Sequence, residues 1–264
     1  MPTTLITGCS SGIGLATARA LKAAGHEVWA TARSAEAVAR LAAEGFTARA
    51  LDVTCPTAVQ ALAAELPALD VLINNAGYGA IGPLLDLPDS TLRAQFDTNV
   101  LGLLAVTRAC LPALRARRGL VVNVGSVSAL LVTPYAGAYC ASKAAVHALS
   151  DALRMELAPL AVRVMEVQPG AIGTQFAANA GAQAELALRE GSPWWPLREH
   201  IRERARASQQ HGSAPEAVAA AILRALPRPP RVLRVGRGSR ALPWLARWLP
   251  KALLEGLLRR RYGL

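Results

Sequence analysis

The chain has 264 residues, 52% of them hydrophobic and 18% charged, so it can fill a large core and disorder is excluded for most of it. Apolar runs are broken before ~18 residues and the first residues show no leader pattern, so we expect neither a membrane-spanning helix nor a secretory signal. The net charge of +11 arises from residues 189–264, which hold 16 Lys+Arg against 5 Asp+Glu. Four cysteines lie far apart without CxxC spacing, which favours free thiols and a cytoplasmic location.

Short apolar or β-branched segments alternate with Ala- and Leu-rich helical patterns along most of the chain. Strands are expected at 3–7, 27–31, 47–51, 71–74, 120–125, 163–168 and 232–235. Helices are expected at 12–24, 35–44, 56–65, 89–116, 140–158 and 215–225, with 89–116 bent. This order predicts an α/β fold, a doubly wound (Rossmann) parallel sheet of six to seven strands with its ligand beyond the carboxyl ends of the strands.

The last third of the chain departs from this alternation. Residues 171–212 are expected to form a substrate lid within a single domain of residues 1–238. Residues 239–264 are expected to form an amphipathic helical extension, with a Leu/Trp face that packs over the substrate cleft or on a subunit partner. Peripheral membrane contact through these helices is the alternative. The face consists of Leu242, Trp244, Leu245, Trp248, Leu249, Leu253, Leu254, Leu257 and Leu258.

The first expected strand runs into the sequence TGCSSGIG at residues 7–14, where a helix begins. Gly8, Gly12 and Gly14 allow a tight turn and a close approach of a pyrophosphate, whose charge the helix N-terminus favours. A plain glycine turn between strand and helix is the alternative. Ser10, Ser11 and Ile13 complete this candidate dinucleotide site.

The ends of the next strands supply further candidate cofactor contacts. Arg33 stands where an NAD-binding protein usually offers a carboxylate to the ribose, and its guanidinium suits the 2′-phosphate of NADP(H) instead. An ordinary surface arginine is the alternative. Asp52 and Val53 are placed near an adenine edge. Asn74 is expected to stabilise the sheet, while Asn75, Ala76 and Gly77 are expected to border the cofactor.

Tyr139 and Lys143 form a YxxxK pair in the expected helix after the fifth strand. Residues four apart share a helix face, so the Lys143 ammonium is expected to favour the ionised form of the Tyr139 phenol. A solvated Tyr and Lys on a helix surface is the alternative. Ser126, 13 positions before Tyr139, closes the fifth strand.

Together these motifs resemble the short-chain dehydrogenase/reductase family, over roughly residues 3–175. The resemblance implies a catalytic tetrad of Asn99, Ser126, Tyr139 and Lys143. It also implies contacts of Tyr139 and Lys143 with the cofactor, and a nicotinamide side lined by Pro169, Gly170, Ile172 and Thr174. TGCSSGIGLATA and ATAR are similar to the NADP-using branch that includes 17β-hydroxysteroid dehydrogenases.

The implied chemistry is NADP(H)-dependent hydride transfer between a hydrophobic ketone or aldehyde and its alcohol. Tyr139 would be the proton donor and Ser126 would hold the carbonyl oxygen. The expected partners are this small substrate and further copies of the chain, as a dimer or tetramer. A non-catalytic NADP-binding sensor or scaffold is the alternative function. No nucleic-acid partner and no metal site are expected, because the arginines are dispersed and the four histidines lack ligand spacing.

Overall fold

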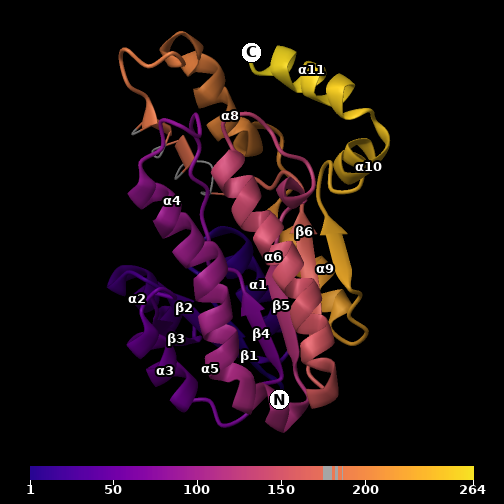
Figure 1. Cartoon of the computed structure of the whole chain (residues 1–264). Helices are drawn as coiled ribbons and strands as arrows, with labels where there is room; N and C mark the ends of the chain where they lie inside the picture. The colour runs from indigo at the N-terminus through magenta and orange to yellow at the C-terminus, as the bar shows by residue number, and fades with distance from the viewer. Residues whose placement is uncertain (175–179, 182–183, 186) are drawn as a thin grey trace.

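A computed structural model describes residues 1–174, 180–181, 184–185 and 187–264, with the backbone alone at 208–211. Its centre is one sheet of seven parallel strands in the order β3-β2-β1-β4-β5-β6-β7 (Figure 1). The strands coincide with the expected segments to within a residue or two. They are β1 (Thr3–Ile6), β2 (Glu27–Ala32), β3 (Thr47–Ala50), β4 (Val71–Asn74), β5 (Leu120–Val124), β6 (Arg163–Pro169) and β7 (Val232–Val235).

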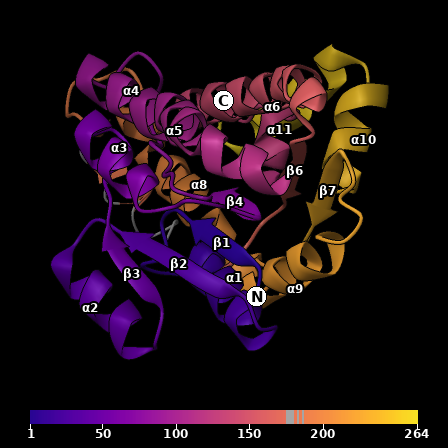
Figure 2. The same cartoon turned by 90° about the horizontal axis from the view of Figure 1, so that it is seen from below.

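Helices cover both faces of the sheet, as Figure 2 shows in the view from below. On one face lie α1 (Gly12–Ala23), α2 (Ala35–Ala43) and α9 (Pro215–Ala225). On the other face lie α3 (Pro56–Ala64), α4 (Asp89–Phe96), α5 (Gly102–Arg117) and α6 (Gly137–Glu156). The chain reverses its winding direction between β1 and β4, which is where a doubly wound sheet opens a ligand crevice.

The strand residues alternate between the two halves of the core. Leu5, Leu72 and Val121 pack toward α3 and α5, whereas Ile6, Ile73 and Val122 pack toward α1 and α9. Each of these side chains is at most 1% exposed, and burial of a side chain of this size contributes ~1.5–3 kcal/mol. The apolar runs noted in the sequence are therefore strands buried on both faces, as parallel sheets require.

The expected bend in the helix at 89–116 is a π-helical turn. α4 and α5 are joined without interruption by a π segment at Asp97–Leu101. The whole run Asp89–Arg117 is the one described stretch with the length and apolar composition to cross a membrane. Half of that apolar window is buried inside the protein, as in a core helix.

The C-terminal part leaves some of the expected Leu/Trp face uncovered. α8 (Arg198–His211), α10 (Ala241–Trp248) and α11 (Lys251–Arg261) lie beyond the carboxyl ends of the strands (Figure 1). Trp244 and Trp248 are 61% and 65% exposed, and Leu253 and Leu257 are also exposed, whereas Leu242 is half-buried. α11 meets the rest of the chain at its C-terminal end, where the Tyr135 hydroxyl donates to the Tyr262 carbonyl at 3.0 Å.

The segment expected to form a lid is described in part. Residues 175–179, 182–183 and 186 of it lie outside the described residues. α8 occupies its second half as a regular helix, anchored by the fully buried Ile201, where the sequence pattern indicated no helix.

Candidate active site

The glycine-rich turn between β1 and α1 has the geometry of a phosphate cradle. Gly8 and Gly12 have φ values of +74° and +60°, a region that disfavours residues with a side chain. A Cβ on Gly14 would lie 2.3 Å from the carbonyl oxygen of Gly8, so Gly14 lets the helix approach the turn. The Asn75 amide holds the turn by donating to the carbonyl oxygens of Thr7 and Gly8 at 3.0 and 2.9 Å.

A cavity of about 410 Å³ extends from this turn across the carboxyl ends of the strands. Eighteen of the twenty residues singled out by the sequence line it. They are Gly8, Ser10, Ser11, Gly12, Ile13, Arg33, Asp52, Val53, Asn75, Ala76, Gly77, Ser126, Tyr139, Lys143, Pro169, Gly170, Ile172 and Thr174. The other two, Gly14 and Asn99, stand directly behind the lining.

The end of the cavity near β2 and β3 suits a dinucleotide with a 2′-phosphate. Arg33 and Ser10 are exposed there, and the guanidinium of Arg40 reaches the Ser10 carbonyl oxygen at 3.4 Å. Hydrogen bonds from the amide and hydroxyl of Thr54 hold the pKa of Asp52 below its usual value, with help from the charge of Arg33. The glycine-rich turn and the arginine after β2 therefore offer donors to the phosphates of a dinucleotide.

Asn99 is turned inward by the π segment. Its side chain accepts a hydrogen bond from the Tyr78 amide at 3.0 Å and donates to the Tyr78 carbonyl oxygen at 2.9 Å. It also donates to the Ser142 hydroxyl on α6 at 3.0 Å. A Cβ on Gly77 would lie 2.9 Å from Asn99 Oδ1, so only glycine lets the loop pass this close. Asn99 thus ties the loop after β4 to α6.

Asn74 is structural, as expected. Its buried amide donates to the hydroxyl of Thr107 on α5 and to Asn123 Oδ1 on β5, both at 2.9 Å. These bonds join β4 to its neighbouring strand and to the helix above it.

Tyr139 and Lys143 both face the cavity from α6, but their electrostatics differ from the expectation. Burial raises the pKa of Tyr139 to about 12, and the opposing contributions come from a hydrogen bond with Ser126 and the charge of Arg204. Burial also lowers the pKa of Lys143 to about 8. The Lys143 ammonium donates to the Val124 carbonyl oxygen at 2.8 Å. Burial outweighs the contributions that favour the phenolate, so the phenol of Tyr139 holds its proton more tightly than that of a free tyrosine.

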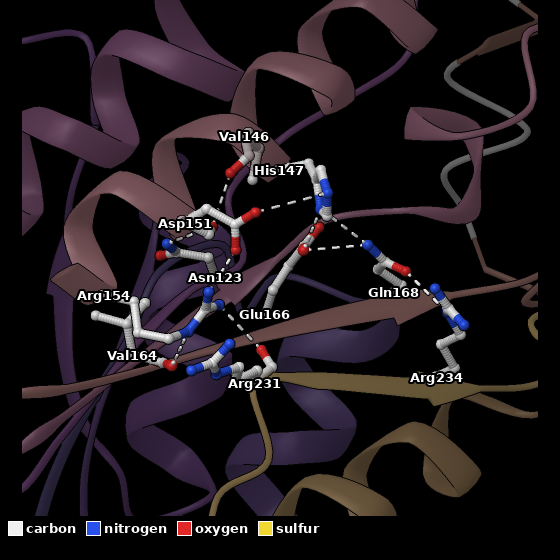
Figure 3. A network of polar contacts seen from close by, with 11 residues as sticks. Asn123, Val146, His147, Asp151, Arg154, Val164, Glu166, Gln168, Arg231 and Arg234 are labelled. Atoms are coloured by element: carbon white, nitrogen blue, oxygen red, sulfur yellow. Dashed lines mark hydrogen bonds and ion pairs between the residues drawn. The ribbon is translucent and has the colours of Figure 1, made fainter. Parts of the chain in front are cut away.

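A buried carboxylate lies behind Lys143. Glu166 on β6 is fully buried, and its Oε2 is 2.7 Å from Nδ1 of His147 and 3.1 Å from Nε2 of Gln168 (Figure 3). The other oxygen, Oε1, has no hydrogen-bond partner among the described residues. The negative charge of Glu166 raises the pKa of Lys143, against the effect of burial. No motif in the sequence marks Glu166.

The far end of the cavity is built from residues that the motifs did not identify. Ile81 and Leu131 line it from loops, Arg204 from α8, and Leu242 and Tyr262 from the C-terminal part. No motif marks these positions, because they belong to separate segments that meet only in the folded chain. Tyr262, for example, lies far along the chain from Tyr139.

Comparisons with known proteins agree with this arrangement. A family model described as short chain dehydrogenase matches residues 2–185. The chain is 42% identical over 181 residues to the uncharacterized oxidoreductase YbbO of Escherichia coli (strain K12), covering 66% of this chain and 67% of that protein. It is 34% identical to a 3-ketodihydrosphingosine reductase of Bacteroides thetaiotaomicron, covering 98% and 97%. It is 36% identical to an NADPH-dependent 1-acyldihydroxyacetone phosphate reductase of Schizosaccharomyces pombe, covering 75% and 70%.

Solved structures show the same fold. A short-chain dehydrogenase from Streptomyces avermitilis superimposes with a TM-score of 0.80 at 33% identity, covering 100% of this chain and 99% of the other. A short chain dehydrogenase from Burkholderia cenocepacia in complex with NADP gives 0.78 at 26% identity, covering 97% of each. One from Burkholderia phymatum in complex with NAD gives 0.77 at 27% identity, covering 88% of each.

Proposed function

Because this chain belongs to the short-chain dehydrogenase family and is an oxidoreductase, we propose that it interconverts hydrophobic ketones or aldehydes and their alcohols with NADP(H). The observation that carries the proposal is the single cavity that joins the glycine-rich turn and Arg33 at one end to Ser126, Tyr139 and Lys143 further along. A cofactor seated on the turn and a substrate beside Tyr139 would meet inside it.

The nicotinamide supplies the hydride, and the residues of this chain handle the proton and the charge. The Ser126 hydroxyl orients the carbonyl oxygen toward Tyr139. With a pKa of about 12, the Tyr139 phenol keeps its proton at neutral pH and donates it to that oxygen. The Lys143 ammonium lies on the same helix face and stabilises the phenolate that remains. Asn99 is a positioning residue, since its hydrogen bonds connect the Tyr78 loop to α6 next to Lys143.

The choice of NADP(H) over NAD(H) rests on Arg33. The residue directly after β2 is Arg33 instead of an acid, and its guanidinium forms part of the cavity where the ribose phosphate would lie. The S. pombe relative is NADPH-dependent and the B. cenocepacia structure holds NADP, whereas the B. phymatum structure holds NAD. Relatives thus use both cofactors, and the local charge favours NADP(H). On this ground we propose that the chain belongs to the NADP-using branch that includes 17β-hydroxysteroid dehydrogenases.

The apolar character of the substrate is inferred from the far end of the cavity. Ile81, Leu131, Leu242 and Tyr262 line it, so an aliphatic or ring-containing carbonyl compound would be largely removed from water there. Two relatives are named as reductases, of 3-ketodihydrosphingosine and of 1-acyldihydroxyacetone phosphate, and both names describe ketones.

The proposal also includes the domain organisation, the cellular location and the assembly of the chain. Residues 1–238 form the catalytic domain and 239–264 an extension that contributes Leu242 and Tyr262 to the substrate end. The four cysteines are free, which suits a reducing cytoplasmic compartment. Assembly into a dimer or tetramer, or contact with a membrane surface, would cover the exposed Trp244 and Trp248.

The proposed function is tested by following NADPH oxidation with a panel of apolar ketones and aldehydes, and NADP⁺ reduction with their alcohols. We expect reduction of medium-chain ketones with NADPH, and a much lower rate with NADH. Absence of turnover across the panel with both cofactors, in a preparation that binds NADPH, would contradict it and favour a binding protein.

A further inference from the structure

A positive charge lines the cavity near the proposed proton donor. Arg204, on α8, lines the same cavity as Tyr139, Ile81, Leu131 and Tyr262. It lies close enough to Tyr139 for its charge to favour the phenolate. The other cationic residues of the lining have roles already: Lys143 beside the phenol and Arg33 at the cofactor end. Arg204 is a cation that the reaction described above leaves without a role.

The guanidinium of Arg204 makes one hydrogen bond to the described residues, through its Nε. Its Nε donates to the hydroxyl of Thr133 at 2.9 Å, and Thr133 also lines the cavity. Its two terminal NH₂ groups have no hydrogen bond or ion pair with any described residue. The one acidic residue among the described lining is Asp52, at the adenine end. The guanidinium thus keeps unused donors in a cavity whose one described carboxylate, Asp52, lies at the adenine end.

The neighbouring arginines show how unusual this position is. Arg202, also on α8, is bound to both Glu185 and Glu199 at 2.6–2.9 Å. Arg261, on α11, is bound to Glu203 at 2.5 Å. Arg204 is partly buried yet has no such acid among the described residues. A cation removed from water without a counter-charge is costly, and an anion arriving from outside would offset that cost.

We propose that the substrate is an oxo acid, an apolar carbonyl compound that carries a carboxylate or phosphate group, and that Arg204 binds this acidic group. The inference rests on the proposed function, because it places the carbonyl at Tyr139 and the acidic group at the guanidinium in the same chamber. Both carboxylate and phosphate match the planar fork of arginine, which can donate two parallel hydrogen bonds to either. Arg204 would thus set specificity and orient the carbonyl.

The test compares matched substrates in matched variants. The substrates are 4-oxononanoate, its methyl ester, and the phosphate monoester of 1-hydroxy-2-octanone, each assayed for kcat/KM with NADPH. The variants are Arg204→Met, Arg204→Lys and, as the control, Arg206→Met, which changes an exposed arginine of the same helix outside the cavity lining. Circular dichroism and thermal unfolding establish that each variant is folded.

We expect the wild type to prefer at least one acid over the neutral ester, and Arg204→Met to reduce kcat/KM for that acid roughly 10- to 100-fold, the range of one charge-assisted interaction. The kcat/KM of Arg204→Met for the ester should change little. For the acid, the kcat/KM of Arg204→Lys should lie between those of the wild type and Arg204→Met, and that of Arg206→Met should equal the wild-type value. The two acids show whether carboxylate or phosphate is the recognised form. An unchanged acid-to-ester ratio in Arg204→Met, or a wild type that prefers the ester, overturns the inference.

A binding measurement separates failure of this inference from failure of the proposed function. Nonanoate and nonanamide are titrated into the enzyme with NADP⁺ by calorimetry, in the wild type and in Arg204→Met. If ketones are reduced but nonanoate binds no better than nonanamide, the acid inference is wrong and the reductase stands. If no carbonyl is reduced but nonanoate binding depends on Arg204, the reductase proposal fails and the acid site stands.

Discussion

Glu166 on β6 and His147 on α6 are 2.7 Å apart, between Glu166 Oε2 and His147 Nδ1, behind the catalytic face of α6 (Figure 3). His147 follows Lys143 by one helical turn, so the buried carboxylate lies beneath both residues of the same face. This pair links the strand that ends at Pro169 to the helix that carries the candidate proton donor. The negative charge of Glu166 also raises the pKa of Lys143.

Reduction should depend on pH through Lys143. Its pKa of about 8 means that the ammonium is present below pH 8 and is lost as the pH rises through this value. We expect kcat/KM for NADPH, which reports ionisations of the free enzyme, to fall above about pH 8. Tyr139 should contribute no further loss until near pH 12.

The substitution Glu166→Gln tests the origin of that pH dependence. It removes the negative charge that raises the pKa of Lys143, so the fall in kcat/KM should move to lower pH. Glu156→Gln is the matched control, since Glu156 lies at an exposed position of α6, the helix that carries Lys143. This substitution should leave the pH profile unchanged. The facing groups His147 and Tyr139 are intact in both variants. A profile that does not move in Glu166→Gln would show that another group sets it.

Tyr139→Phe should abolish reduction while NADPH still binds, because it removes the donated proton and little volume. Lys143→Ala should impair both reduction and binding if its ammonium also contacts the cofactor ribose. Activity is measured by NADPH oxidation and binding by fluorescence titration. Retention of more than about a tenth of the activity in Tyr139→Phe corresponds to less than about 1.4 kcal/mol of barrier and would point to another acid.

Arg33→Ala should reduce the preference for NADPH over NADH, since the guanidinium is expected to meet the 2′-phosphate. Loss of one exposed charge-assisted contact should lower the ratio of the two kcat/KM values by ~10-fold or more. Arg49→Ala is a suitable control, because Arg49 is bound to Glu65 and lies outside the cavity lining. A wild-type enzyme that prefers NADH would refute the assignment of the cofactor.

Asn99→Ala should lower stability together with activity. It leaves the part-buried amide and carbonyl of Tyr78 without their side-chain partner, at a cost of ~1 kcal/mol or more. The free energy of unfolding from urea titration measures the first effect and kcat the second. An Asn99→Ala enzyme that is as stable and active as the wild type would show that the π segment has no positioning role.

Removal of residues 239–264 should raise KM for bulky apolar carbonyls with little change in NADPH affinity. The truncation takes Leu242 and Tyr262 out of the cavity lining, and leaves the glycine-rich turn and Arg33 intact. Steady-state kinetics with short and long ketones gives the comparison. A truncated enzyme with unchanged kinetics that loses binding to liposomes would instead assign these helices to a membrane surface.

The sequence by itself determined the sheet, its strands and the cofactor end of the site. Parallel strands buried on both faces require continuous apolar runs, and a phosphate cradle requires glycines at fixed spacing, so both leave a local pattern. Tyr139 and Lys143 could be paired because a helix brings residues four apart to one face. Each of these features depends on neighbours in the chain.

Only the tertiary structure decided the proton affinities and the substrate end. Burial, which no local pattern reveals, raises the pKa of the Tyr139 phenol and lowers the pKa of the Lys143 ammonium. Arg204, Leu242 and Tyr262 come from segments far apart in the chain, and Glu166 reaches Lys143 only because β6 packs under α6. The sequence could not predict the exposure of Trp244 and Trp248 either, because an amphipathic pattern identifies an apolar helix face but not the surface that packs on it.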